Sequence, residues 1–327
     1  MNISLQYQEL LNFVEKNISD LVPEFEPKSL YEPFKYVMLG GGKRIRPIFN
    51  LLGCGIASND HNEAIYSAVA LEILHNFTLV HDDIMDNSNF RRNRPTVHKK
   101  WNYPIAILTG DVMIGYAYKL LNKYNNHRNF NQILTLFTNE VIEVCEGQIL
   151  DMDFNSNKNV SFDDYINMID KKTARLIETS LAIGGLIGNC NEIEYNSLKN
   201  IGKNVGLAFQ IQDDILDMVA DETKLGKKIG NDLLEGKKTI LVIKAKETVN
   251  EKDDTEFIEY YFNNNGLKDN EIKIMDEIFK KYNIYDFAID KMNQYFDIAE
   301  ANYQYLKDNR YKELLIDIIS KLKNRKY

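Results

Sequence analysis

Proline is scarce in this chain of 327 residues: there are six, and none follows Pro104. Proline interrupts a helix because it lacks an N–H donor and its ring clashes with the preceding turn. The long proline-free stretch therefore permits long helices. It argues against a sandwich or barrel of short strands separated by proline- and glycine-rich turns.

Cysteine is also scarce, and long apolar runs are missing. The three cysteines, Cys54, Cys145 and Cys190, are widely spaced, which excludes a disulfide framework or a zinc pattern and is typical of a reducing cytoplasm. No run approaches the roughly 18 apolar residues of a membrane-spanning helix, and the start of the chain lacks the basic and apolar regions of an export signal. We therefore expect a cytoplasmic protein without stable membrane insertion.

The chain has no excess of positive charge. Lys and Arg number 40 against 48 Asp and Glu, which gives a net charge of −8, so we expect no general binding of nucleic acid. Apolar residues make up 44% of the chain, too many for a disordered protein. A globular acidic protein that handles anions must gather its basic residues locally.

Apolar residues recur with a helical period along most of the chain, and no run alternates convincingly with period two. We predict a single all-α domain over residues 1–327, without solenoid repeats. The predicted helices cover approximately residues 10–21, 63–86, 105–124, 130–152, 163–188, 194–220, 238–248, 255–263, 271–282, 285–307 and 311–323.

The most informative feature is an acidic pentapeptide that occurs twice, DDIMD at residues 82–86 and DDILD at residues 213–217. On a helix, the first and last carboxylates of each pentapeptide lie one turn apart on the same face. Mg²⁺ binds a few carboxylates together with substrate phosphates, so the two clusters predict a magnesium–diphosphate site between two helices. Solvated acidic surfaces are the alternative, but apolar residues flank both clusters and like charges at this spacing repel.

A glycine-rich basic turn, GGGKRIRP at residues 40–47, leads into a predicted helix with Pro47 near its first position. Helix N-termini favour phosphate, and Lys43 and Arg46 add positive charge and hydrogen-bond donors. The turn lacks the spacing of a P-loop and by itself is weak evidence for an anion site.

Further basic residues accompany the two acidic clusters. Each of them alone could belong to a solvated surface, and His75, about two helical turns before Asp82, could be a hydrogen-bonded core residue. The basic segments are residues 91–94 (RRNR), Lys172-Thr173, Gly226-Lys227 and Gly236-Lys237.

In this order, these residues resemble the trans-isoprenyl diphosphate synthase (polyprenyl synthetase) family over about residues 39–240. The resemblance implies an all-α, isoprenoid-synthase-type helical bundle around a deep central hydrophobic cavity, which forms a homodimer. It also implies Mg²⁺-dependent, head-to-tail condensation of isopentenyl diphosphate with an allylic diphosphate. The matching elements are GGKRIRP (41–47), His75, the two acidic clusters, Arg91-Arg92, PTVH (95–98), Gly147-Gln148, Lys172-Thr173, Phe209-Gln210, Lys227 and Gly236-Lys237.

The resemblance implies a role for each matched residue. About three Mg²⁺ ions would be held, with Asp82, Asp86 and Asp213 as ligands, and Gln148 and Asp151 would support the site. Isopentenyl diphosphate would be bound by Lys43, Arg46, His75 and Arg92. The allylic diphosphate would be bound by Arg91, Lys172, Thr173, Gln210, Lys227 and Lys237. The catalytic set would be Asp82, Asp83, Asp86, Lys172, Thr173, Gln210, Asp213, Asp214 and Asp217.

The sequence departs from the family pattern at two places. Asn93 stands where the family usually has glycine; asparagine tolerates a left-handed backbone, so we expect the loop to persist. Ile240 stands where many members have proline, a form that resembles archaeal members.

Product length is indicated by the residues just before the first acidic cluster. Phe77 and Thr78 lie five and four residues before Asp82. This combination resembles archaeal-type geranylgeranyl (C20) synthases, whereas farnesyl (C15) synthases of that type tend to be aromatic at both positions. We expect C20 first, then C15, then longer products.

Three other functions are weighed against condensation. A class I terpene cyclase needs only one diphosphate site, and Lys43, Arg46 and His75 argue for a second. An HD-type phosphohydrolase leaves the second acidic cluster unexplained, and a non-catalytic partner subunit would not need both clusters intact.

The basic end of the chain, residues 321–326, could close over the site, but a frayed, solvated terminus is the preferred interpretation.

Overall fold

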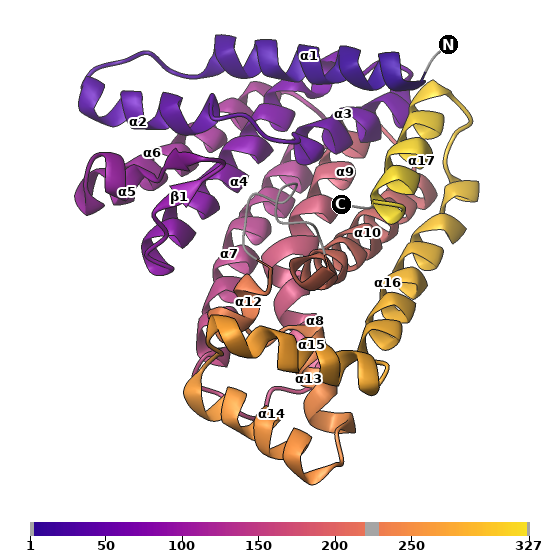
Figure 1. Cartoon of the computed structure of the whole chain (residues 1–327). Coiled ribbons are helices and arrows are strands. Elements are labelled where there is room, and N and C mark those ends of the chain that lie inside the picture. Colours follow the sequence, from indigo (N-terminus) through magenta and orange to yellow (C-terminus); the bar gives the residue numbers. More distant parts are fainter. Residues whose placement is uncertain (1–2, 220–228, 326–327) are drawn as a thin grey trace. The chain divides into compact units, whose positions relative to one another are not determined.

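The computed structural model describes residues 3–219 and 229–325, and this part of the chain is almost entirely helical (Figure 1). It divides into two compact units, each assembled from separate stretches of sequence. Unit 1 comprises Met1–Val141, Leu176–Lys199 and Asn302–Ile318, and unit 2 comprises Ile142–Arg175, Asn200–Ala301 and Ile319–Tyr327.

Unit 1 contains the N-terminal helices and one short hairpin. Its complete elements are α1 (Ile3–Leu21), α2 (Lys28–Met38), α3 (Ile45–Ser58), η1 (Asn62–Ala64), α4 (Ile65–Met85), β1 (Phe90–Arg91), β2 (Arg94–Pro95), α5 (Val97–Lys100), α6 (Tyr103–Leu121), η2 (Asn122–Tyr124) and η5 (Tyr303–Tyr305). It also holds the first half of α7 (Phe130–Phe154), nearly all of α9 (Arg175–Ile187), and the starts of α10 (Glu192–Val219) and α17 (Arg310–Lys323).

Unit 2 holds the remaining parts of α7, α10 and α17. Its complete elements are α8 (Phe162–Ile169), η3 (Asp170–Ala174), α12 (Asn231–Leu234), α13 (Ile240–Thr248), α14 (Lys252–Asn264), η4 (Asp269–Glu271), α15 (Ile272–Lys281) and α16 (Ile284–Ala301). Helix α13 packs against α8, α14, α15 and α16. Its residues Ile240, Leu241, Val242 and Ile243 are all buried, so α13 forms the core of this unit.

Helices α4 and α6 pack extensively against each other in unit 1 and run antiparallel. Near the end of α4, His81 lies against Gly110 of α6, where a β-carbon would collide with the imidazole. Near the start of α4, the Ser67 N–H donates to the hydroxyl of Tyr124, just after α6. The glycine thus allows the helices to meet closely at the end of α4 that carries the first acidic cluster.

A second close approach in unit 1 explains the glycine-rich apolar stretch of α9. A β-carbon at Gly53 of α3 would collide with the backbone of Leu181, and one at Gly184 would collide with the backbone of Asn50. The two helices therefore meet backbone to backbone. The bond from Asn50 Nδ2 to the Ser180 carbonyl, 2.9 Å long, joins them further.

The predicted helices agree with the structure in type, and most boundaries agree within a few residues. Helix α2 was not predicted, because Pro33 lies inside it. The β1–β2 hairpin is too short to show a period of two. Its turn residues Arg92 and Asn93 have φ values of 51° and 59°, so the expected left-handed tolerance of Asn93 is confirmed. None of the helices within the described residues has the length and apolarity needed to span a bilayer.

Candidate active site

The first acidic cluster lies at the C-terminal end of α4. Asp82 is half-buried in the last turn, and Asp86 is the exposed C-cap residue whose N–H donates to the Asp82 carbonyl. This turn contains no basic residue. The negative end of a helix dipole disfavours carboxylates, so a cation bound to Asp82 and Asp86 would relieve an unfavourable arrangement.

Asp83 makes a different contact from its neighbours. It is buried, and its Oδ1 accepts from Arg91 Nε of β1 at 2.7 Å. Burial raises the pKa of Asp83 above its usual value, against the opposing effect of Arg91. In the structure Asp83 anchors the hairpin that carries Arg91 and Arg92, and its predicted membership of the catalytic set stays a prediction.

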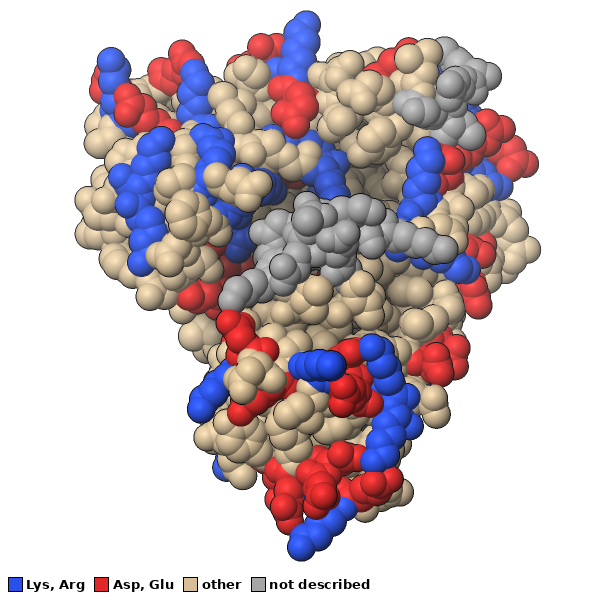
Figure 2. All heavy atoms as spheres, in the orientation of Figure 1, with Lys and Arg blue, Asp and Glu red and all other residues tan. Residues whose placement is uncertain are grey.

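Four residues assigned to isopentenyl diphosphate lie in unit 1. Lys43 is exposed, Arg46 lies in the first turn of α3, His75 lies on α4, and Arg92 lies in the hairpin turn. Burial, followed by the positive charges of Arg46 and Arg92, holds the pKa of His75 well below its usual value. A neutral imidazole can still donate one hydrogen bond to an anion. Figure 2 shows Lys and Arg side chains gathered where Figure 1 labels β1 and α5.

The second acidic cluster occupies the C-terminal end of α10, whose last turn also has no basic residue. Asp213 Oδ1 pairs with Arg325 Nη1 at 2.8 Å. The Asp217 carboxylate accepts from the N–H of Asp232 at 3.0 Å, in the first turn of α12. Both clusters therefore place carboxylates at the negative end of a helix.

Both carboxylate oxygens of Asp214 accept hydrogen bonds within a buried chain of side chains. Its Oδ2 accepts from the Tyr165 hydroxyl at 2.7 Å, and its Oδ1 accepts from Gln210 Nε2 at 3.0 Å. Gln210 Oε1 in turn accepts from the Thr173 hydroxyl at 3.0 Å. Burial raises the pKa of Asp214 to about 7. The chain fixes the orientation of the Gln210 amide.

The backbone of Ile240, which stands where many family members have proline, also contacts this hydrogen-bond chain. Its N–H donates to Asp214 Oδ2 at 3.4 Å, a weak bond that a proline could not make. Ile240 occupies the first position of α13, where proline is tolerated in a helix. The departure is therefore compatible with the same local backbone.

Lys172 and Thr173 lie on η3, a π-helical turn between α8 and α9. Such turns are rare and frequently occur at functional sites. The turn is held closely on two sides, because a β-carbon at Gly147 would collide with the Lys172 backbone and one at Gly206 would lie 2.5 Å from Ala174 Cα. The helix predicted over residues 163–188 is confirmed, and the structure adds a π-helical turn within it.

Asp151 joins two lysines assigned to the allylic diphosphate. Its Oδ2 lies 2.6 Å from Lys172 Nζ and 3.3 Å from Lys237 Nζ. Burial acts to raise the pKa of Asp151, but Lys172 and Lys237 lower it below its usual value. The two lysines, 65 residues apart in sequence, thus share one carboxylate. Lys227, the third lysine of this group, lies outside the described residues.

The two residues that indicate product length lie together on α4. Phe77 is buried and makes an edge-to-face contact with His81, with ring centroids 4.8 Å apart. The half-buried Thr78 donates its hydroxyl to the His75 carbonyl at 2.8 Å.

Sequence reasoning missed two residues of the second cluster's surroundings. No sequence signal marked Tyr165, since its partner Asp214 is 49 residues away. Arg325 belonged to the basic end that was interpreted as a solvated terminus, which is wrong for this residue: its side chain is 16% exposed and pairs with Asp213.

Within residues 3–219 and 229–325, no group of three or more Asp, Glu, His or Cys side chains is placed to hold a metal ion. Mg²⁺ commonly takes only one or two carboxylates and completes its coordination with water and substrate phosphates. The carboxylate pair of Asp82 and Asp86, at a helix end that favours a cation, has donor chemistry that fits such an ion.

Comparison with known proteins connects these features to one family. The polyprenyl synthetase family model matches residues 27–279. The chain is 41% identical to a short chain isoprenyl diphosphate synthase of Methanocaldococcus jannaschii, over 84% of this chain and 80% of the relative. It is 39% identical to a geranylgeranyl diphosphate synthase of Saccharolobus solfataricus, over 92% and 91%. The crystal structure of a geranylgeranyl pyrophosphate synthetase from Pyrococcus horikoshii matches with a TM-score of 0.90 and 34% identity, covering 99% of this chain and 98% of that chain.

Proposed function

Because the chain belongs to the polyprenyl synthetase family, we propose that it is a geranylgeranyl diphosphate synthase. It is a short-chain prenyltransferase with the all-α isoprenoid synthase fold, and the substrates of prenyl synthases are isoprenyl diphosphates. The observation that carries the proposed chemistry is the presence of two acidic clusters, each at the negative end of a long helix. Relatives named as geranylgeranyl synthases support the C20 product.

Prenyl synthases are generally Mg²⁺-dependent, and bound Mg²⁺ would supply positive charge that stabilises the allylic diphosphate as its carbon–oxygen bond breaks. We assign Asp82, Asp86 and Asp213 as ligands of about three ions. Asp217 and Asp83 would support them from the same helix ends. The Arg325–Asp213 pair means that the arginine must move, or share the carboxylate, when an ion binds there.

The allylic diphosphate would be held by Arg91, Lys172, Lys237 and Lys227. Lys172 and Lys237 are already brought together by Asp151, which supports a shared anion as their ligand. The oxygens of Thr173 and Gln210 would face the allylic cation, since oriented dipoles stabilise charge that develops in the transition state. Asp214 and Tyr165 would keep the Gln210 oxygen in place.

Isopentenyl diphosphate would be held by Lys43, Arg46, His75 and Arg92. The lowered pKa of His75 means that its imidazole is neutral at pH 7 and serves as a hydrogen-bond donor, not as a charge. The departing diphosphate would accept the proton that completes the condensation.

We propose further that two copies of this chain form a homodimer. Helix α6 exposes three large side chains of apolar character, Tyr103, Ile107 and Leu108. Exposed apolar clusters mark interaction surfaces, and a second copy of this chain would cover them.

The reaction is tested by supplying purified protein with Mg²⁺, labelled isopentenyl diphosphate and dimethylallyl, geranyl or farnesyl diphosphate. We expect a labelled C20 product, loss of turnover with a chelator, and recovery when Mg²⁺ is restored, because the diphosphate leaves only when its charge is neutralised. Product chromatography reads the chain length. Failure with all three primers would reject condensation, a C15 end product would reject only the chain length, and cyclised products without isopentenyl diphosphate would indicate a terpene cyclase.

Phe77→Ala is expected to lengthen the products beyond C20, because it removes a buried ring beside the first acidic cluster and leaves room for a longer chain. Chromatography of the dephosphorylated products measures the change. Phe137→Ala removes another buried phenylalanine of unit 1 and serves as the matched control. An unchanged distribution in a folded Phe77→Ala protein would reject Phe77 as the determinant.

A further inference from the structure

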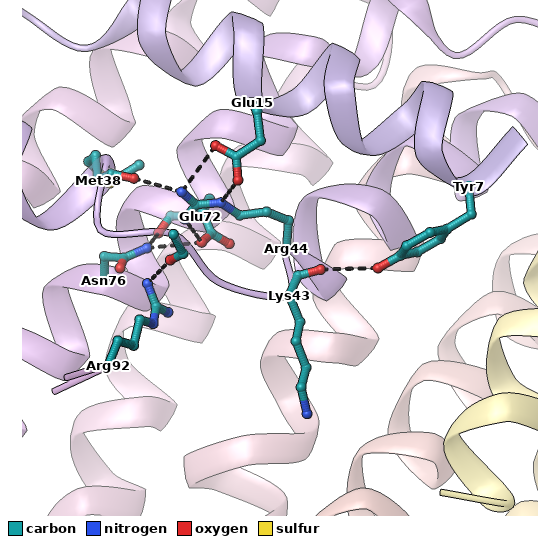
Figure 3. Close-up of polar contacts among 9 residues, drawn as sticks. Tyr7, Glu15, Met38, Lys43, Arg44, Glu72, Asn76 and Arg92 are labelled. Atoms are coloured by element: carbon teal, nitrogen blue, oxygen red, sulfur yellow. Dashed lines mark hydrogen bonds and ion pairs between the residues drawn. The ribbon is translucent and has the colours of Figure 1, made fainter. Parts of the chain in front are cut away.

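Arg44 lies between Lys43 and Arg46, yet its side chain points into the protein and is 2% exposed (Figure 3). Its Nε donates to Glu15 Oε1 at 2.8 Å, and its Nη1 donates to Glu72 Oε1 at 2.6 Å. Its Nη2 donates to the Met38 carbonyl at 2.7 Å and to Glu15 Oε2 at 3.3 Å. The guanidinium therefore joins α1, the end of α2 and α4.

The backbone of Arg44 is left-handed, with φ 50° and ψ 33°, at the N-cap position of α3. This conformation is unfavourable for a residue with a β-carbon and persists only where surrounding contacts impose it. The four hydrogen bonds of the side chain are such contacts. The turn ends the loop that carries Lys43 and begins the helix that carries Arg46, so it sets the direction in which both side chains leave the backbone.

The same loop is tied to the hairpin. Arg92 Nη1 donates to the Gly41 carbonyl, and a β-carbon at Gly42, whose φ is 146°, would lie 3.0 Å from Arg92 Cζ. The backbone of the loop thus lies directly against the Arg92 guanidinium. A shift of the loop would move the acceptor that holds Arg92.

The network also reaches the neighbour of His75. Glu72 Oε1, which pairs with Arg44, accepts from Asn76 Nδ2 at 3.1 Å (Figure 3). Asn76 is buried and directly follows His75 on α4. Lys43 and His75 therefore adjoin members of this network in sequence, Arg46 lies two residues from Arg44, and Arg92 is bonded to the loop that Arg44 ends.

Arg44 itself is poorly placed to bind a substrate anion. Two carboxylates, those of Glu15 and Glu72, surround its single positive charge, and its donors point toward protein acceptors. Arginine suits this place because its planar fork serves several acceptors at once, which a lysine ammonium does less well.

We propose that Arg44 is a positioning residue for isopentenyl diphosphate: its ion pairs with Glu15 and Glu72 hold the left-handed turn that orients Lys43 and Arg46 and fixes the Gly41 carbonyl for Arg92. The inference rests on the proposed function and extends it from the residues that touch the anion to the buried network that orients them. Loss of the network should weaken the binding of isopentenyl diphosphate more than the binding of the allylic diphosphate.

The mildest test is Glu15→Gln, because the Glu15 side chain is 40% exposed and its loss leaves no buried carboxylate unpaired. We expect the KM for isopentenyl diphosphate to rise about threefold, equivalent to about 0.65 kcal/mol. The KM for the allylic diphosphate should change by less than threefold, and so should kcat. Glu9→Gln, at an exposed position of the same helix, is the matched control and should leave all three constants unchanged.

Arg44→Lys keeps the charge but cannot reproduce the fork, and we expect the KM for isopentenyl diphosphate to rise about tenfold, or about 1.4 kcal/mol. The double variant Arg44→Met/Glu72→Gln avoids a buried uncompensated charge, and Tm shows whether it is folded. We expect the KM of the folded double variant for isopentenyl diphosphate to stay above the wild-type value.

Two results would overturn the inference: a return of the folded double variant to the wild-type KM, or an equal rise of both KM values in these variants. Absence of condensation by the wild-type protein is a different outcome, because it would overturn the proposed function itself.

Discussion

Asp82→Ala is expected to lower kcat by about a thousandfold, or about 4 kcal/mol in activation free energy, without unfolding the protein. Asp82 stands in the last turn of α4, at the negative end of the helix dipole, and that turn itself contains no basic residue. The helix dipole disfavours a carboxylate at this end and favours a cation, so we expect Asp82 to act as a ligand of Mg²⁺. Steady-state condensation at saturating Mg²⁺ measures the loss.

The expected effect on stability is small. The helix dipole disfavours a carboxylate at a helix C-terminus, so we expect the Tm of Asp82→Ala in Mg²⁺-free buffer to stay close to the wild-type value. Asp111→Ala, at an exposed position of α6, controls for the loss of one negative charge in the same unit. Turnover of Asp82→Ala within tenfold of the wild-type value would remove Asp82 from the metal site.

Gln210→Ala is expected to lower kcat about a hundredfold, in the range that single oriented dipoles contribute to transition-state stabilisation. The Gln210 oxygen is held by Thr173 on one side, and its nitrogen donates to Asp214. Tyr165 acts only through this chain, by donating to the other oxygen of Asp214. We therefore expect Tyr165→Phe to lower kcat about tenfold, since it loosens Asp214 without touching the reacting atoms.

A double-mutant cycle separates positioning from a general loss of packing. If Tyr165 acts through Gln210, adding Tyr165→Phe to Gln210→Ala should cost no further kcat. Tyr295→Phe, at a half-buried tyrosine of unit 2, should leave kcat unchanged. Independent, additive losses from Tyr165→Phe and Gln210→Ala would show that the hydrogen-bond chain does not orient the glutamine.

Local features of the chain were predictable because they depend on neighbours in sequence. The apolar period of residues 63–86 is visible without a structure, and α4 spans Ile65–Met85. The i, i+4 spacing of Asp82 and Asp86 follows from helix geometry alone. The expected backbone of Asn93 needed only the known tolerance of asparagine for the left-handed region.

The π-helical turn at Asp170–Ala174 was not predictable in this way. An amphipathic pattern cannot distinguish it from an α-helix, because the extra residue is accommodated by close neighbours. Those neighbours are Gly147 on α7 and Gly206 on α10. The first precedes the turn in the sequence and the second follows it. The backbone that presents Lys172 and Thr173 therefore depends on packing.

The sequence by itself determined the helical class, the two acidic clusters and the basic residues that accompany them, because helical periodicity and charge are local properties. Only the tertiary structure decided which charges face each other. Arg44 pairs with Glu72 over 28 residues, Tyr165 with Asp214 over 49, and Lys237 with Asp151 over 86. Once buried, a charged group must find a partner, and the folded chain supplies it: Arg44 turns inward to its carboxylates, while exposed Lys43 beside it remains on the surface.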